Sequence, residues 1–226
     1  MTTNGYSVTW EELVGSGSGL SPRTLQEFAH PGETTHALLT LNGAVVPGGD
    51  FASGENHAEY ELLHSAAWAD TLDAVGGAGT SARVGVVINR TPCHFVFGRN
   101  PWMEGEPAAF FATLEESLPT ERIDRPWRGC SLQLASALKD FWRAYPDARK
   151  AGVEFVLACR GYYAGRQFST RAYRRHQAAT TTFDLGCLIE AGWKLRALAV
   201  DQTLSERGEA LANVLPRVEA WVSGGR

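Results

Sequence analysis

The sequence predicts an α/β fold in which one mixed sheet begins with an antiparallel hairpin and continues with parallel strands. Asn42-Gly43 lies between two short apolar runs, and this dipeptide is the strongest short signal for a two-residue hairpin turn. Apolar strand patterns at 84–88, 153–158 and 195–200 are separated by segments with helical periodicity. Strands that alternate with helices imply right-handed crossovers and parallel pairing.

The bulk properties indicate one well-cored domain with an insertion. The chain has 226 residues, of which 44% are hydrophobic and 20% are charged, as in ordinary globular proteins. A net charge of −4 argues against indiscriminate coating of nucleic acid but allows a local basic patch. No apolar run reaches the roughly 18 residues of a membrane helix, and the N-terminus lacks the order of a signal peptide, so we expect a cytoplasmic protein without a membrane partner. Four cysteines at irregular spacings favour metal ligands or buried thiols over a disulfide scaffold.

The main domain is expected to span residues 21–226. Residues 1–20 are expected to be a peripheral extension that ends in a flexible Gly-Ser linker. Residues 94–129 mix proline, glycine and aromatic residues without a period, which indicates an insertion. The predicted elements are a short helix at 10–14, a helix from Ser21 to Phe28, strands at 37–41 and 44–46, a loop at 48–56, a helix from His57 that closes at 76–81, a strand at 84–88, a helix from Cys130 to Tyr145, a strand at 153–158, a helix at 182–191, a strand at 195–200 and a last helix with an apolar stripe over 211–222.

A histidine and a glutamate two residues apart, His57 and Glu59, open an apolar-faced helix. Thr91-Pro92-Cys93 follows the next buried strand. This pattern resembles the H-x-E…P-C-x-x-C signature of zinc-dependent nucleobase deaminases, in which zinc activates a water and a glutamate that is not a ligand shuttles protons. Catalytic zinc usually keeps three protein ligands and one open position. His57 and Cys93 supply two of them.

The third ligand is displaced in the sequence. The position three residues after Cys93 is Val96, whereas Cys130 opens the helix that should follow the Pro-Cys motif. Without residues 94–127 the chain reads Thr91-Pro92-Cys93-Arg128-Gly129-Cys130, which restores P-C-x-x-C. We therefore predict that an insertion splits the motif and that Cys130 completes the zinc site. The other candidates fit less well: His94 is adjacent to Cys93, and Cys159 and Cys187 resemble ordinary buried thiols.

These motifs are similar to the cytidine deaminase superfamily over most of residues 37–200. The run from His57 to Leu63 and the run from Phe155 to Tyr163 resemble the AID/APOBEC and bacterial toxin deaminases. The resemblance implies a three-layer α-β-α sandwich around a five-stranded sheet, with the last two strands parallel. It also implies Zn²⁺ as cofactor, Glu59 as the proton shuttle, and delivery as an effector as one route of action. The substrate-binding residues that it implies are Asn42, Ala58, Thr91, Arg160, Tyr162 and Tyr163.

The expected substrate is nucleic acid. No acidic residue occurs between Glu154 and Asp184, whereas arginines and aromatic residues interleave there. Arginines suit phosphates and aromatic rings stack on bases, as in proteins that bind single-stranded or flipped-out nucleotides, although a solvated arginine loop has the same composition. We expect a hydrolytic deaminase that converts cytosine to uracil in DNA or RNA. The alternatives are a deaminase of a free nucleoside, nucleotide or specialised metabolite, a deaminase-like binding module without metal, and a Cys93 nucleophile paired with His57.

Overall fold

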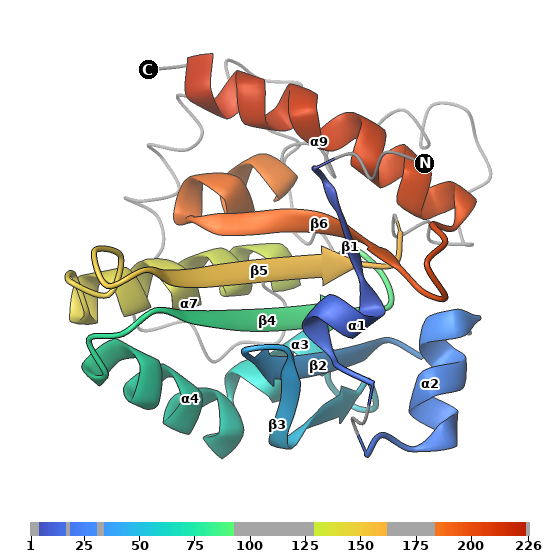
Figure 1. Cartoon of the computed structure of the whole chain (residues 1–226), viewed down its shortest axis with the longest axis horizontal. Coiled ribbons are helices and arrows are strands. Elements are labelled where there is room, and N and C mark those ends of the chain that lie inside the picture. The colour runs from blue at the N-terminus through green and yellow to red at the C-terminus, as the bar shows by residue number, and fades with distance from the viewer. Residues whose placement is uncertain (1–4, 17–18, 31–33, 93–128, 162–183, 225–226) are drawn as a thin grey trace.

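Six strands form one mixed sheet, with helices on both of its faces (Figure 1). The computed structural model describes residues 5–16, 19–30, 34–92, 129–161 and 184–224. The strands lie in the order β1-β6-β5-β4-β2-β3. Their bounds are Ser7–Thr9 for β1, His36–Leu41 for β2, Ala44–Ala52 for β3, Ala82–Ile88 for β4, Val153–Cys159 for β5 and Trp193–Ala199 for β6.

The pairing is antiparallel on one side of β4 and parallel on the other. β2 pairs antiparallel with β3 and with β4, whereas β4, β5 and β6 run parallel and β1 adds parallel to β6. The predicted hairpin and the parallel half of a mixed sheet are therefore confirmed, but the sheet has six strands where five were expected. The carboxyl ends of β4, β5 and β6 meet at one edge, which also holds the start of β2. Ligands of open α/β sheets usually bind at such an edge.

Two sets of helices cover the two faces of the sheet. The larger core cluster lies between the sheet and α3, α4, α7 and α9, together with helical residues 184–191. The smaller cluster lies under α1 and α2, on the opposite face. Within the described residues, no helix combines the length and apolar composition needed to cross a bilayer. The helix bounds are Trp10–Leu13 for α1, Pro22–Ala29 for α2, Ala58–Leu63 for α3, Ala66–Gly77 for α4, Cys130–Ala144 for α7 and Glu206–Gly224 for α9.

The central strands β4 and β5 are buried on both faces. Val86 and Ile88 of β4 belong to the larger cluster and Val87 belongs to the smaller one, as the alternation of side chains along a strand requires. A strand covered on both faces is continuously apolar, which explains why the sequence predicts it so clearly. Phe155 of β5 is the centre of an aromatic group in the larger cluster, with ring centroids 4.8 to 6.5 Å from those of Phe141, Trp142, Trp193 and Trp68.

The N-terminal segment belongs to the sheet and to the core. β1 pairs with β6, and Thr9 and Glu12 form a reciprocal capping box at the start of α1. Leu13 and Val14 are buried in the smaller cluster. The expectation of a peripheral extension is therefore corrected for residues 5–16. A three-residue strand carries too little periodicity to be recognised in a sequence.

The expected loop at 48–56 also differs, because β3 continues past Pro47 to Ala52. β3 is an edge strand, where proline costs no essential ladder bond. The register of the β2–β3 pair shifts between Leu38 and Thr40, which accommodates the extra residues.

The helix predicted after His57 is divided into α3 and α4 at Ser65. The Ser65 hydroxyl donates to the Leu62 carbonyl at 2.7 Å and accepts from the Trp68 backbone N–H at 3.1 Å. Ser65 therefore ends α3 and caps α4. The apolar spacing of the sequence continues through both helices, so it does not reveal this break.

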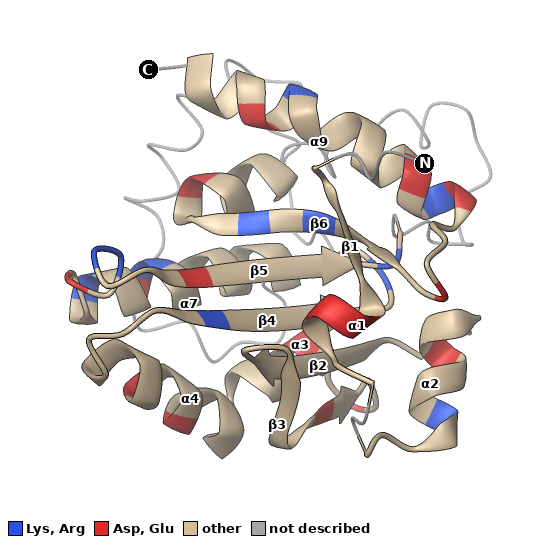
Figure 2. Cartoon of the chain, viewed as in Figure 1, with Lys and Arg blue, Asp and Glu red and all other residues tan. Residues whose placement is uncertain are grey.

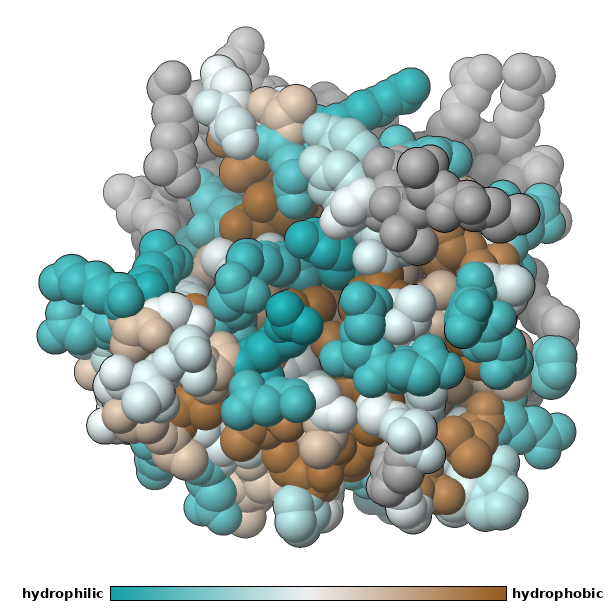
Figure 3. Space-filling model, viewed as in Figure 1, coloured by the Kyte–Doolittle hydropathy of each residue, from teal (hydrophilic) through white to brown (hydrophobic). Residues whose placement is uncertain are grey.

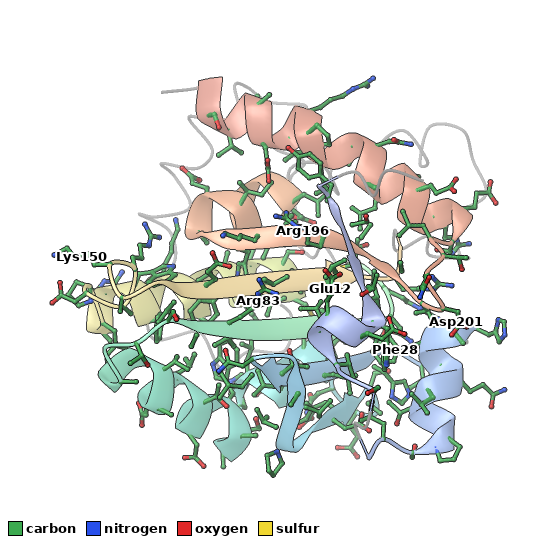
Figure 4. The ribbon with its side chains drawn as sticks, in the orientation of Figure 1. Glu12, Phe28, Arg83, Lys150, Arg196 and Asp201 are labelled. Atoms are coloured by element: carbon green, nitrogen blue, oxygen red, sulfur yellow. The ribbon has the colours of Figure 1, made fainter. Side chains whose placement is uncertain are left out.

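One face of the sheet carries charged side chains beside α1. Figure 2 shows basic residues on β4 and β6 and an acidic residue on β5, and Figure 3 shows hydrophilic side chains gathered over the same area. Arg83 and Arg196, labelled in Figure 4, extend from β4 and β6. Lys194 Nζ lies 2.5 Å from Glu154 Oε1 on this face. These charged side chains place the N-terminal ends of β4, β5 and β6 in contact with solvent on this face.

Candidate metal centre

Three side chains from the starts of two neighbouring helices form a group that could hold a metal ion. They are His57, Glu59 and Cys130, whose ligand atoms all lie within 4.8 Å of one another. His57 Nδ1 lies 3.2 Å from Cys130 Sγ. The group lies where α3 packs against α7, so residues that are 73 positions apart in sequence meet there.

The start of α3 places the imidazole and the carboxylate at different depths. His57 is the N-cap, with extended backbone angles φ −73° and ψ 147°, and Glu59 is the second residue of the helix. Glu59 is only 2% exposed, whereas His57 is exposed. Asn56 Nδ2 donates to Glu61 Oε1 at 2.7 Å, which holds the residue before His57 against the first turn of α3. The H-x-E spacing thus joins a solvent-facing imidazole to a buried carboxylate.

The start of α7 places the thiol. Cys130 is the first residue of this 15-residue helix, follows the N-cap Gly129 and is 2% exposed. The positive end of a helix macrodipole favours the thiolate, which is the form that binds metals. Trp193 Nε1 donates to the Leu134 carbonyl at 3.0 Å, which anchors α7 on β6.

Residues 89–92, which precede Cys93, reach the same place from β4. The Thr91 backbone N–H donates to the Gly161 carbonyl at 2.9 Å, and Ser131 Oγ donates to the Pro92 carbonyl at 3.3 Å. The residue before Cys93 therefore contacts the residue after Cys130. This contact brings together the two chain ends that flank the predicted insertion, as the split motif requires. Cys93 itself lies outside the described residues, so its role as a ligand stays a prediction.

The donor atoms are compatible with a metal ion, and the spacing can be compared with that of a zinc site. Zn–N and Zn–S bonds of about 2.05 and 2.3 Å at a tetrahedral angle separate the nitrogen from the sulfur by about 3.6 Å. The separation of His57 Nδ1 and Cys130 Sγ, 3.2 Å, is a few tenths of an ångström shorter. One imidazole and one thiolate also belong to the ligand types that zinc prefers. The two atoms would therefore need to move apart by only a few tenths of an ångström to accept the ion.

Two of the implied substrate residues lie beside this group. Ala58 is fully buried between His57 and Glu59, and Thr91, which is 3% exposed, precedes Pro92. Tyr162 and Tyr163 lie outside the described residues. Their roles, like those of Ala58 and Thr91, stay predictions.

Asn42 is not brought to the group. It lies in the hairpin turn at the far end of β2, where its Oδ1 accepts from the Arg83 backbone N–H at 2.8 Å. The six residues of β2, at about 3.4 Å each, separate this turn by roughly 20 Å from the edge that holds the site. We therefore correct the expectation that Asn42 contacts the substrate, because its amide completes the turn.

The guanidinium of Arg160 donates hydrogen bonds to backbone carbonyls of the fold. Arg160 Nη1 donates to the Thr203 carbonyl at 3.0 Å and to the Leu198 carbonyl at 3.5 Å. Burial lowers the pKa of Arg160 from its ordinary value. These contacts hold the turn after β6 against the end of β5. A role for Arg160 in substrate binding stays a prediction.

Cys159 and Cys187 are buried thiols, as the sequence predicts. Burial is the main cause that raises the pKa of each thiol well above its ordinary value, so both stay protonated. The Glu59 carboxylate adds to the raised pKa of Cys159, which places that thiol within electrostatic reach of the group. Neither belongs to the His57, Glu59 and Cys130 set.

Sequence reasoning missed two residues that hold the Pro-Cys segment in place. Ser131 donates to the Pro92 carbonyl, and the buried Asn89 bonds to three segments of the chain. A polar residue directly after an apolar strand is a weak signal for Asn89, and Ser131 has none beyond its place next to Cys130. Their partners are distant in sequence and are known only from the fold.

No protein-family model matches the chain, and no curated protein matches it. The fold and the site establish an α/β protein with a six-stranded mixed sheet flanked by helices. They also establish a His57, Glu59 and Cys130 group that is compatible with a metal ion.

Proposed function

We propose that this chain is a zinc-dependent hydrolytic deaminase that converts cytosine to uracil in nucleic acid, on a single-stranded or flipped-out base. The observation that carries the proposal is the 3.2 Å approach of His57 Nδ1 to Cys130 Sγ beside the buried Glu59. The sheet supports it, since β3-β2-β4-β5-β6 have the hairpin and the final parallel pair that the deaminase resemblance implies.

His57 and Cys130, with Cys93 as the third ligand, would hold the ion. Zinc bound there supplies a polarised water whose pKa falls towards neutrality. The contact between Ser131 and Pro92 supports a shared site for the two cysteines, because it joins the segments that carry them.

We assign to Glu59 the role of proton shuttle. Hydrolytic deamination adds water to the amidine carbon of the base and releases the amino group as ammonia. Glu59 takes a proton from the attacking water, passes it to the ring nitrogen and then helps to protonate the departing amine. Its burial favours transfer to the bound base over exchange with bulk water.

The substrate class rests on composition. The segment rich in arginine and aromatic residues begins at Arg160, and beyond Gly161 it lies outside the described residues until 184. Its charge and rings suit phosphates and unstacked bases. The net charge of −4 leaves a free nucleoside, nucleotide or specialised metabolite as the alternative substrate, and a deaminase-like binding module as the alternative without catalysis.

A second function is favoured by one observation. A thiol 3.2 Å from an imidazole at a helix start also matches a cysteine nucleophile activated by a histidine, here Cys130 with His57. It leaves the buried Glu59 without a role, and Cys130 is only 2% exposed. A metal-dependent reaction gives a role to all three side chains of the group and is therefore the preferred function.

The experiment compares two glutamates on one helical turn. The full chain and its Glu59→Gln and Glu61→Gln variants are assayed for uracil formation on single-stranded DNA, single-stranded RNA, duplex DNA and free cytidine, with zinc content measured on the same samples. Glu59→Gln should lose about 10²- to 10⁴-fold in rate, the usual contribution of general acid–base catalysis, and keep its zinc. Glu61→Gln is the matched control, because glutamine still accepts the hydrogen bond from Asn56 Nδ2.

The outcomes separate the hypotheses. Turnover of free cytidine alone would reject nucleic acid as the substrate. Protein that neither holds zinc nor deaminates any substrate would reject the deaminase. Hydrolysis that resists chelators but stops on thiol alkylation would favour the Cys130 nucleophile.

A further inference from the structure

A single buried amide holds the end of β4 next to the candidate metal centre. Asn89 is 2% exposed and directly follows the last residue of β4. Its Oδ1 accepts from the His36 backbone N–H at 2.9 Å, and its backbone N–H donates to the His36 carbonyl at 3.2 Å. Its Nδ2 donates to the Thr34 carbonyl at 3.0 Å and to the Glu27 carbonyl at 3.4 Å. One side chain thus joins β4 to β2, to the segment before β2 and to the last turn of α2.

Residues 90–92, directly after Asn89, have no regular structure and depend on separate contacts. Thr91 is held by the Gly161 carbonyl, and Pro92 is held by the Ser131 hydroxyl. Ser131 adjoins Cys130, so the hydrogen bond to Pro92 links this segment to the start of α7. Backbone groups buried outside regular structure must find such partners. A displacement of Asn89 would therefore shift Thr91, Pro92 and the first turn of α7.

We propose that Asn89 is a positioning residue for the metal centre, acting through segment 90–92 on the ligand geometry at Cys130. This inference rests on the proposed function, since the effect of Asn89 on the ligand geometry can be observed only when a metal binds. Partners that orient metal ligands without touching the ion typically contribute 10- to 100-fold in metal affinity. Asn89 acts through backbone rather than through a ligand side chain, because its three side-chain bonds reach the His36 N–H and the Thr34 and Glu27 carbonyls.

The chain contains a matched control. At the other end of the same β2–β4 pair, the Asn42 backbone N–H donates to the Arg83 carbonyl at 2.8 Å, and Asn42 Oδ1 accepts from the Arg83 N–H at 2.8 Å. Asn42 therefore repeats the pair of bonds that Asn89 makes with His36, about 20 Å from the metal centre by the length of β2. Loss of its amide perturbs the same two strands without touching segment 90–92.

The test compares Asn89→Ala, Asn89→Asp and Asn42→Ala in the full chain. Zinc affinity is measured by competition with a chromophoric chelator, and cobalt(II) absorption reports the ligand geometry. Asn89→Ala should bind zinc 10- to 100-fold more weakly and shift or weaken the thiolate–cobalt band. Asn89→Asp keeps the acceptor for His36 but sets a carboxylate oxygen against the Thr34 and Glu27 carbonyls, so it should weaken zinc binding at least as much as Asn89→Ala. It has the same size as asparagine and carries the test if the alanine variant does not fold. Asn42→Ala should keep the wild-type affinity and spectrum.

Unfolding measured on the same proteins separates positioning from stability. Asn89 variants that are folded and match wild type in zinc affinity and cobalt spectrum would overturn the proposal, as would an equal loss of affinity in Asn42→Ala. Wild-type protein that binds neither zinc nor cobalt would instead reject the proposed function, and the positioning role with it.

Discussion

The two ends of the β2–β4 pair use the same residue type and the same backbone bonds, yet only one end carries the candidate site. At the far end, Asn42 and Gly43 adopt positive φ angles of 51° and 82°, and the chain turns straight back into β3. At the near end, Asn89 is buried and its amide reaches two further segments before the chain continues irregularly. A tight turn satisfies itself locally, whereas an irregular segment next to a site must be held by distant partners. The comparison predicts that changes at the near end alter metal binding and that changes at the far end alter stability alone.

The largest effect is expected at the near end, from Cys130→Ala. If Cys130 is a ligand as proposed, its removal should weaken zinc binding by more than the roughly 10- to 100-fold cost of losing an outer partner, and the proposed deamination should fall with it. Metal content of the purified protein and competition with a chelator check this.

Cys187→Ala is the matched thiol control. Cys187 is also buried, but it is not part of the metal group, so its variant should keep the wild-type zinc content. If the zinc content of Cys130→Ala equals that of wild type, Cys130 is not a metal ligand, and the predicted metal site at the near end is wrong.

A smaller effect is expected at the far end, from Gly43→Ala. Gly43 has φ 82°, and a Cβ there would lie 3.3 Å from the Glu12 carbonyl oxygen. The left-handed conformation costs an alanine roughly 1–2 kcal/mol, so the free energy of unfolding should fall by about that amount. Denaturant unfolding measures the loss, and chelator competition should show zinc affinity equal to wild type. A drop in zinc affinity would show that the two ends are coupled through the sheet.

The smallest effect is expected from the ion pair at the beginnings of β5 and β6. The hydrogen bond from Lys194 is the main cause that lowers the pKa of Glu154. A lowered folded-state pKa adds stability above the unfolded pKa of glutamate, about 4.3, and this stability is lost as the pH falls through the folded-state value. Both side chains are more than a third exposed, so the contribution should stay below about 1 kcal/mol.

Urea unfolding of wild type and Glu154→Gln over this pH range checks the sign. The difference between the two proteins should be present at neutral pH and vanish in acid. A difference that grows towards acid pH would contradict the assignment.

Local patterns in the sequence were enough for most of the elements. The Asn-Gly hairpin, the apolar β4 and β5, and the helix that begins at Cys130 follow from turn chemistry and periodicity, which act within a few residues. The H-x-E pair is local in the same sense, because one helix start carries both groups. These features were predicted because neighbours in sequence supply their physical cause.

Tertiary structure decided which of these pieces meet. β1 is a strand only because β6 offers it a partner, and Pro47 and two glycines stay in β3 because it lies at the edge of the sheet. Asn42 and Asn89 look alike in sequence, and only the strand order shows which of them lies beside the Pro-Cys segment. Arg160 is held by carbonyls of another loop, which no local pattern records. The sequence by itself determined the elements and the chemical types at the candidate site, whereas long-range pairing and buried hydrogen bonds determined their positions, because those interactions join residues tens of positions apart.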